Sequence, residues 1–277
     1  MSTQALTAPA PADLRFHPLR DSATMLRRNL KRMLRYPSMT VTLVGMPVVF
    51  LLLFVYVFGG TLGAGLGGAV HSGAAGGRAA YANYVAPAII LMTVTATVQG
   101  TAISIAMDMT EGIITRFRTM HIARVSVLTG HVLGSVIQSV VSVAIVIGVA
   151  LLVGFRPTAD PGRWLATAGF LVAVSYALVW LSVALGQVSK SVETASNLPM
   201  PLVLLPFLSS GFVPTDSLPA GIRWFAEYQP FTPIIETLRD LLMDKPIGNN
   251  AWIALAWCAG IALGGYLWSR RLFNRES

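Results

Sequence analysis

Residues 131–155 read HVLGSVIQSVVSVAIVIGVALLVGF and contain no Asp, Glu, Lys or Arg. A helix of about 20 such residues crosses the hydrocarbon core of a bilayer. Five further apolar runs are equally free of these charged residues: 39–58, 84–107, 164–188, 198–213 and 251–268. The sequence therefore predicts an all-α polytopic membrane protein with six transmembrane helices, the fifth of them short, in a transmembrane domain over 39–268.

The composition excludes two broad classes of protein. Of the 277 residues, 54% are hydrophobic and 12% are charged, and the mean hydropathy is +0.65. Soluble domains carry about 25% charged residues, and disordered chains combine low hydrophobicity with high charge, so neither class fits. Cys258 is the only cysteine and lies in an apolar run. It therefore has no partner for an intrachain disulfide, and a cysteine-based metal cluster is excluded.

The basic residues indicate on which side of the membrane each connection lies. With a cytoplasmic N-terminus, the inside segments hold 14 of the 20 basic residues, while the acidic residues divide evenly. Because cytoplasmic loops carry an excess of Lys and Arg, we expect cytoplasmic tails at 1–17 and 269–277. Residues 1–18 lack the apolar core of a signal peptide. The net charge of +8, placed beside apolar spans, favours a membrane surface over nucleic acid as the partner.

Residues 18–36 predict an amphipathic helix that lies in the headgroup layer before the first span. Basic residues fill much of the surface between the apolar positions, and Pro37 ends the helix. The alternative is an ordinary flank whose basic side chains snorkel to the interface. The apolar stripe recurs at helical spacing: Leu19, Ala23, Leu26, Leu30 and Met33.

Residues 214–250 are predicted to form two short re-entrant or interfacial helices that pack on the outer end of the bundle. Ser217 is expected to cap the first helix, and Thr232 with Pro233 is a favourable start for the second. The expected apolar side of the first helix is Leu218, Ile222 and Phe225, and that of the second is Ile235, Leu238, Leu241 and Leu242.

The sequence lacks the residues that ion-coupled transport, intramembrane hydrolysis or nucleotide binding usually requires. The six cores contain no Asp, Glu, Lys or Arg of the kind that ion-coupled transporters use, and no H-E-x-x-H motif occurs. No histidine is predicted at mid-membrane depth to activate a serine. Gly63, Gly65 and Gly68 match G-x-G-x-x-G but follow a membrane span, and Ser189 stands before Lys190 where a P-loop needs glycine. We therefore predict a chain that is not an enzyme and binds no metal or cofactor.

Mild polar residues recur on one face of the second and third spans. Such stripes are candidates for lining a translocation path, and the alternative is close helix packing, which small and hydroxyl residues favour. A serine pair near the outer end of the fifth span has the same two interpretations. The path candidates are Thr93, Thr97, Thr101, Ser135, Gln138, Ser142, Ser209 and Ser210.

The predicted cytoplasmic loop over 108–130 combines charged and apolar residues. Ile113, Ile114 and Phe117 form an apolar patch beside Arg116 and Arg118. A short helix of this kind, held between two spans, docks into a groove on a soluble partner. The alternative is a solvated loop whose arginines only set the orientation of the chain.

Together these features resemble the permease subunits of bacterial type-2 ABC exporters, and especially the daunorubicin-resistance permease branch. The resemblance covers nearly the whole chain, and two stretches carry it most specifically. The first stretch holds Glu111-Gly112, Arg116, Arg118, Arg124, Leu128 and Gly130; the second holds Gly211-Phe212-Val213-Pro214, Leu218-Pro219, Ile222-Arg223, Gln229-Pro230 and Glu236 to Arg239.

One residue departs from the family pattern. The family commonly has proline at the position of His121, so a softer turn is expected there.

The resemblance implies a division of labour in the bacterial cytoplasmic membrane. The chain would supply half of the pathway for an amphiphilic substrate and pair with a second permease copy or a paralogue. Two copies of a cytoplasmic ABC ATPase would bind ATP and Mg²⁺, one docked on each permease. By this similarity the ATPase-coupling residues are Glu111, Gly112, Ile113, Arg116, Phe117 and Arg118, and the outer gate candidates are Leu218, Pro219 and Pro233.

The substrate is less sharply indicated than the family. Short loops without an added carbohydrate-binding domain favour hydrophobic drugs or natural products. The alternative for the same fold is export of a lipid, glycolipid or polysaccharide. From another class, an ATP-independent channel or a membrane scaffold stays open, although the sequence shows no ring of charge for a selectivity filter.

Overall fold

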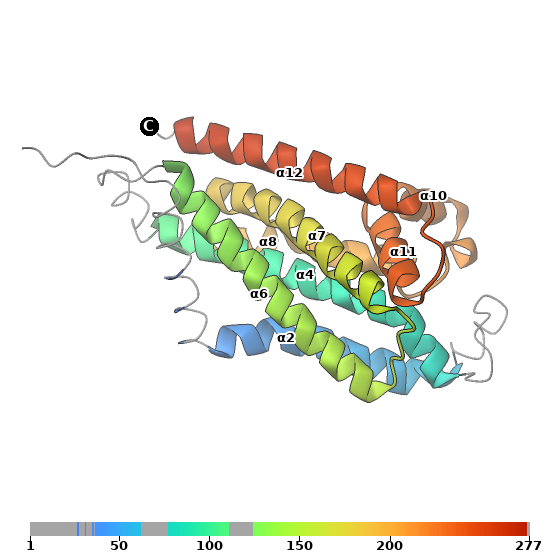
Figure 1. The fold of residues 1–277 in the computed structure, drawn as a ribbon. Helices are drawn as coiled ribbons and strands as arrows, with labels where there is room; N and C mark the ends of the chain where they lie inside the picture. The colour runs from blue at the N-terminus through green and yellow to red at the C-terminus, as the bar shows by residue number, and fades with distance from the viewer. Residues whose placement is uncertain are drawn as a thin grey trace, which may run out of the picture.

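Five long apolar helices form the body of the protein (Figure 1). The computed structural model describes Arg27, Lys31, Arg35 and residues 37–61, 77–110 and 124–275, and this part of the chain contains no β-strand. Each of the five helices is long and apolar enough to cross a membrane, which confirms the prediction of an all-α polytopic membrane protein. They are α2 (Pro37–Leu52, continued by the π-helical η1, Leu53–Phe58), α4 (Arg78–Thr110), α6 (Arg124–Val153), α7 (Pro161–Val188) and α12 (Asn250–Arg275).

The segment expected as a short fifth span, 198–213, is a series of short helices. They are α8 (Val192–Asn197), α9 (Met200–Leu204) and the 3₁₀-helix η3 (Leu205–Leu208). Prolines at 199, 201 and 206 remove backbone donors, and this breaks a continuous ladder of helical hydrogen bonds.

The broken segment nevertheless runs along most of α4. Gln99 Nε2 donates to the carbonyl of Ser196 at 2.8 Å, and the Tyr84 hydroxyl donates to the carbonyl of Ser210 at 2.8 Å. Gln99 and Tyr84 are about 22 Å apart along the axis of α4. The segment therefore carries the chain back toward the start of α4, and α12 then returns to the end of the bundle from which α2 begins (Figure 1).

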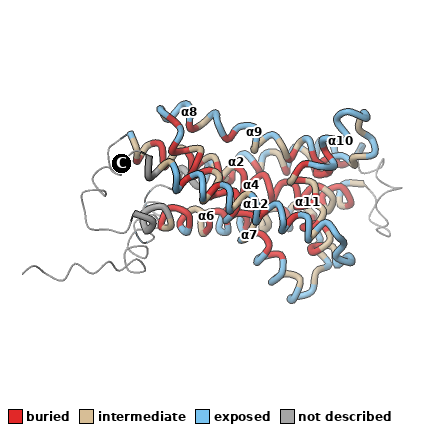
Figure 2. Tube along the Cα trace, turned by 90° about the horizontal axis from the view of Figure 1, so that it is seen from above, coloured by how far each residue is buried: buried red, intermediate tan, exposed pale blue. Residues whose placement is uncertain are grey.

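Helix α4 lies at the centre of the bundle. It packs against α2, α6, α7, the α8–η3 segment and α11, and most of its hydrophobic side chains are buried. Figure 2 shows the buried residues concentrated along the inner helices, whereas α8 to α10 are largely exposed. A helix surrounded by protein needs mostly apolar residues all round, which explains why the polar residues in the middle of α4 are mainly small threonines.

Glycines allow the closest helix approaches. A β-carbon on Gly265 of α12 would lie 2.7 Å from the backbone nitrogen of Leu181 in α7, and one on Gly186 of α7 would lie 2.8 Å from the carbonyl oxygen of Ala102 in α4. Small residues at helix crossings are the usual means of close packing in a membrane. The order α12 on α7 on α4 therefore depends on these two positions.

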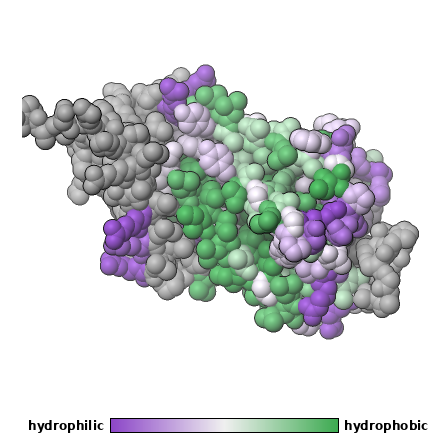
Figure 3. Space-filling view, viewed as in Figure 1, coloured by the Kyte–Doolittle hydropathy of each residue, from purple (hydrophilic) through white to green (hydrophobic). Residues whose placement is uncertain are grey.

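Hydrophobic residues cover the middle of the bundle and hydrophilic residues gather at its two ends (Figure 3). On α12, exposed Trp252 and Trp268 are separated by about 24 Å along the helix axis. Tryptophan collects at both membrane–water interfaces, so this spacing matches a bilayer crossing.

The helices α10 (Ala220–Tyr228) and α11 (Phe231–Leu242) lie at one end of the bundle, here called the α11 end. It also holds the α6–α7 connection and the start of α4 (Figure 1). The predicted stripe of α11 is buried, as expected: Ile235, Leu238, Leu241 and Leu242. In α10, by contrast, Ile222 and Phe225 of the predicted apolar side are exposed, and Ala226 is buried instead.

We expect Gly265→Val to destabilise the protein, because the new side chain meets the backbone of α7. Overpacking of this kind costs about 1–3 kcal/mol. The matched control is Gly264→Val, whose β-carbon would meet nothing within 4 Å. Thermal unfolding of the two purified variants in detergent is the measurement, and equal melting temperatures would contradict the close α7–α12 contact.

Candidate functional site

The predicted ATPase-coupling residues lie outside the described residues. These are Glu111, Gly112, Ile113, Arg116, Phe117 and Arg118. The structure does describe the two helix ends that flank them, Thr110 at the end of α4 and Arg124 at the start of α6. The geometry of the coupling loop therefore stays a prediction, while its attachment points are known.

A buried polar contact joins the two helices beside this loop. His131 Nε2 of α6 lies 3.1 Å from Asp108 Oδ2 of α4, and the two side chains are 8% and 3% exposed. The sequence places His131 at the start of the third span and Asp108 at the start of the coupling loop, and it did not indicate that they pair. The available signal was an acid and a base at the facing edges of two consecutive spans, which antiparallel helices bring together.

The threonine stripe of α4 is buried inside this chain. Thr93, Thr97 and Thr101 each donate their hydroxyl to the backbone carbonyl four residues earlier, at 2.9–3.1 Å. All three are at most 4% exposed. Their polar groups are satisfied within α4 itself, which supports the packing interpretation for these residues.

The polar stripe of α6 divides between two environments. Ser139 contacts Ser175 of α7 at 3.0 Å, and Ser142 is fully buried with no hydrogen-bond partner for its hydroxyl. Ser135 and Gln138 are partly exposed. Among the residues predicted to line a translocation path, Ser135 and Gln138 are therefore the two whose side chains lie at the surface of the chain.

Two further serines form hydrogen bonds between spans, and the sequence analysis did not predict these contacts. The Ser182 hydroxyl of α7 donates to the carbonyl of Val98 in α4, and the Ser269 hydroxyl of α12 donates to Gln187 Oε1 at 3.2 Å. Isolated serines in apolar runs carry no periodic signal, so the sequence did not single them out.

The outer gate candidates lie around the start of α10 and α11. Pro219 is exposed at the N-cap of α10, Leu218 is half-buried, and Pro233 is buried in the first turn of α11. The two expected hydroxyl caps were wrong. The Ser217 hydroxyl donates to the carbonyl of Pro214, within the preceding 3₁₀ turn η4 (Thr215–Ser217), and the Thr232 hydroxyl donates to the carbonyl of Ala226.

These corrections have a common physical reason. Pro219 and Pro230 occupy the N-cap positions, so the helices begin at Ala220 and Phe231. Ser217 and Thr232 therefore do not stand at an N-cap, and each hydroxyl donates to a carbonyl earlier in the chain. Thr232 therefore ties the end of α10 to the first turn of α11 rather than capping a helix.

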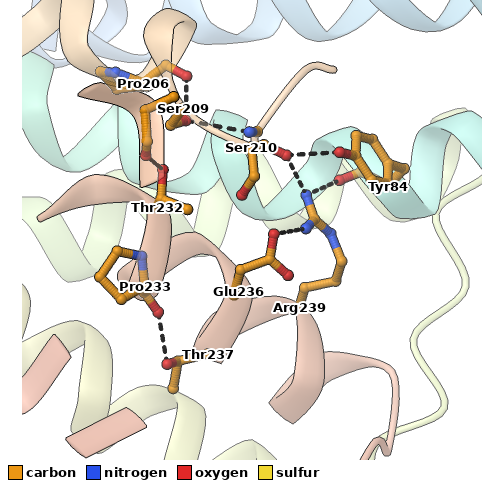
Figure 4. Close-up of polar contacts among 11 residues, drawn as sticks. Tyr84, Pro206, Ser209, Ser210, Thr232, Pro233, Glu236, Thr237 and Arg239 are labelled. Carbon is orange, nitrogen blue, oxygen red and sulfur yellow. Dashed lines mark hydrogen bonds and ion pairs between the residues drawn. The ribbon is translucent and has the colours of Figure 1, made fainter. Parts of the chain in front are cut away.

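A buried arginine connects three separate segments at the α11 end (Figure 4). Arg239 Nη1 of α11 donates to Glu236 Oε1 at 2.7 Å, and Nη2 donates to the carbonyls of Ser210 at 3.0 Å and Tyr84 at 3.2 Å. Its guanidinium carbon lies 4.1 Å from the centre of the Tyr84 ring. We call Arg239, Glu236, Tyr84 and Ser210 the arginine network.

The arginine network holds the outer segment against the bundle. It joins α11, the turn after η3 and the start of α4, which are far apart in the sequence. A guanidinium offers donors in a fixed planar fork and stacks on aromatic faces, so it meets all these partners at once. The sequence singled out Glu236 to Arg239 as a motif but gave no contact for it.

Outside the network, charged groups at this end also form pairs. Arg163 Nε of α7 lies 2.6 Å from Asp244 Oδ1, and Arg223 bonds both Asp216 and Glu227. Burial raises the pKa of the Asp240 carboxyl, and the nearby Glu236 adds to this rise.

Comparisons with a protein family and with individual proteins all point to ABC transporter permeases. The sequence pattern of the ABC-2 type transporter family matches residues 21–243. Over 259 residues the chain is 29% identical to the daunorubicin resistance ABC transporter permease protein DrrB1 of Streptomyces coeruleorubidus, covering 92% of this chain and 86% of that protein. It is also 25% identical over 164 residues to a probable doxorubicin resistance ABC transporter permease protein, DrrC, of Mycobacterium tuberculosis, covering 58% and 59% of the two chains.

We expect Arg239→Gln to lower the stability of the folded chain by about 2–3 kcal/mol. The substitution leaves Glu236 without its counterion and removes donors from two carbonyls, while the 28% exposure of Glu236 keeps the loss below that of a fully buried pair. Thermal unfolding in detergent measures the effect.

The matched control for this prediction is Arg223→Gln, which breaks two exposed ion pairs at the same end, those with Asp216 and Glu227. Exposed pairs contribute little to stability, so its melting temperature should stay close to that of the unmodified chain. An equal loss in both variants would show that the arginine network has no special stabilising role.

Proposed function

The chain belongs to the ABC-2 type transporter family, and from this premise we propose that it is the permease subunit of an ATP-driven bacterial exporter. Its substrates are hydrophobic drugs or natural products. The observation that carries the proposal is the likeness, along 92% of this chain, to a permease protein named for daunorubicin resistance. The bundle of membrane-crossing helices fits a transport subunit.

The energy for transport comes from a separate protein in this proposal. Two copies of a cytoplasmic ABC ATPase bind ATP and Mg²⁺ and dock on a pair of permeases, the second of which is identical or a paralogue. The orientation with both chain ends in the cytoplasm follows the distribution of basic residues. The start of α2 and the end of α12 lie at the same end of the bundle, which fits two chain ends on one side of the membrane (Figure 1).

The coupling loop lies between α4 and α6 and meets the ATPase through Glu111, with Ile113 and Phe117 in an apolar groove. The buried contact of Asp108 with His131 supports this role, since it fixes the two helices on either side of the loop to each other. Movement of the loop then displaces α4 and α6 together rather than one helix alone.

We assign the translocation path by surface exposure and the outer gate by position in the short helices. Ser135 and Gln138 on α6 are partly exposed in this chain and are the leading path residues. Leu218 and Pro219 lie at the start of α10, and Pro233 lies in the first turn of α11, so movement of these short helices against the bundle opens or closes the outer end.

Co-purification tests the proposal directly. The chain, tagged and co-expressed with a candidate ABC ATPase, is expected to carry that ATPase through purification and to support ATP hydrolysis in lipid. Glu111→Lys should reduce both association and hydrolysis while leaving membrane insertion unchanged, because the charge that meets the ATPase is reversed.

The matched control is Glu193→Lys, the same charge reversal at an exposed residue in the first turn of α8. It should behave like the unmodified chain. Normal transport by a stably inserted Glu111→Lys variant would reject the coupling role of Glu111. Failure to retain any candidate ATPase would favour a channel or scaffold.

Replacement of Thr97 separates the two interpretations of the α4 stripe. Thr97→Val keeps the shape of the side chain and removes only the hydroxyl, which here bonds Thr93. We expect the order in which compounds stimulate ATP hydrolysis by the assembled complex to stay the same. The companion variant is Gln138→Leu on the partly exposed face of α6, which should change that order. The reverse outcome would place the path along α4.

A further inference from the structure

A cavity of about 520 Å³ opens at the α11 end beside the arginine network. Its size lies within the range of pockets that hold small ligands. The start of α4, the α6–α7 connection, the turn around η4 and the end of α11 form its walls. Its polar and charged lining includes Asn83, Tyr84, Arg156, Ser210, Arg239 and Lys245.

The cavity carries more positive than negative side chains. Both lining carboxylates already have partners, since Glu236 pairs with Arg239 and Asp216 lies 2.7 Å from Arg223. Among the described residues, Arg156 and Lys245 form no ion pair. Arg156 uses Nη1 for two backbone carbonyls, Leu151 and Phe155, neither of which neutralises its charge.

Nearby segments do not cancel this surplus. Asp240 interacts electrostatically with Lys245 but also with Arg163 and Arg239, and it does not line the cavity. Residues 62–76, which join α2 and α4 at this end, contain no Asp or Glu in their sequence. The cavity therefore has two cations available for an anionic ligand.

The cavity walls also hold polar groups without partners. Ser210 and Arg239 are 4% and 6% exposed, and within the described chain the Ser210 hydroxyl and Arg239 Nε have no hydrogen-bond partner. An unsatisfied buried donor costs free energy unless something outside the chain supplies an acceptor. These groups, with the side chains of Asn83, Thr158 and Thr215, favour a ligand rich in acceptor oxygens.

The cavity lies at the depth of the lipid headgroups. Trp224 and Tyr228 of α10 are about two-thirds exposed, and Arg223 of the same helix pairs with the cavity residue Asp216. Trp252 at the start of α12 is exposed as well. Exposed tryptophan and tyrosine mark the membrane–water interface, so the cavity opens at the level of the lipid phosphates.

We propose that this cavity binds the anionic, phosphate-bearing headgroup of an amphiphile, with Arg156 and Lys245 as the phosphate-binding residues. The acyl chains stay in the membrane beside α10. Arginine presents a planar set of donors that suits phosphate, and lysine adds a mobile point charge. Binding of this kind requires neither ATP nor a partner ATPase, so it is tested independently of export.

The test measures lipid retention on the full chain in neutral detergent by native mass spectrometry. The probes are phosphatidylglycerol and phosphatidylcholine, which differ in net headgroup charge. The chain should retain phosphatidylglycerol in preference to phosphatidylcholine. The double variant Arg156→Gln with Lys245→Gln should weaken binding of phosphatidylglycerol about fivefold for each cation removed.

Two controls separate the site from general charge and from folding. Arg78→Gln removes an exposed cation that lies 5.1 Å from the Tyr56 ring, at the same end but outside the cavity, and should leave the preference unchanged. Arg156→Lys with Lys245→Arg keeps both charges and should retain it. Equal retention of the two lipids by the unmodified chain, or a preference that survives the double glutamine variant, would overturn the proposal.

Competition with inorganic phosphate identifies the source of recognition. Displacement of phosphatidylglycerol by millimolar phosphate supports the proposal and assigns recognition to the phosphate group alone. Resistance to phosphate, combined with dependence on both cations, supports it as well and shows that the acyl chains contribute. A preference that depends on neither cation contradicts it.

Discussion

The guanidinium of Arg239 is held over the ring of Tyr84 while its nitrogens bond two backbone carbonyls and the carboxylate of Glu236. In surroundings of low dielectric constant a buried charge must be paired, and breaking one pair exposes the others to the same penalty. The start of α4, the turn at Ser210 and the helix α11 therefore move as one unit. This side chain and the buried apolar face of α11 together hold the outer segment against the bundle.

Helix α4 connects the arginine network to the opposite end of the bundle. At one end it takes part in the arginine network through Tyr84, and at the other Asp108 contacts His131 of α6. Between these points α4 is buried, and Gly186 lets α7 approach its backbone closely. Packed interfaces of this density switch between discrete arrangements rather than deforming gradually. A displacement at the loop end thus has a rigid element along which to reach the α11 end.

The sequence predicted the long spans well because a membrane imposes a simple rule, namely about 20 apolar residues without charge. It also located the buried stripe of α11, where Ile235 and Leu238 follow helical spacing. Two local details were predicted wrongly: the hydroxyls of Ser217 and Thr232 donate to carbonyls three and six residues earlier instead of capping helices. Contacts between distant segments could not be predicted at all. The contacts of Arg239 join residues as distant as 84 and 239, and no local pattern encodes such a separation.

The burial of the α4 threonines has a consequence for any translocation path. Their hydroxyls bond their own helix and face other parts of the same chain, so a substrate that crosses the membrane does not meet them in this conformation. The partly exposed polar residues of α6, Ser135 and Gln138, instead lie at a surface that one chain leaves open. A closed pathway requires a second wall opposite such a surface. The proposed pairing of two permeases supplies that wall, and a single chain does not.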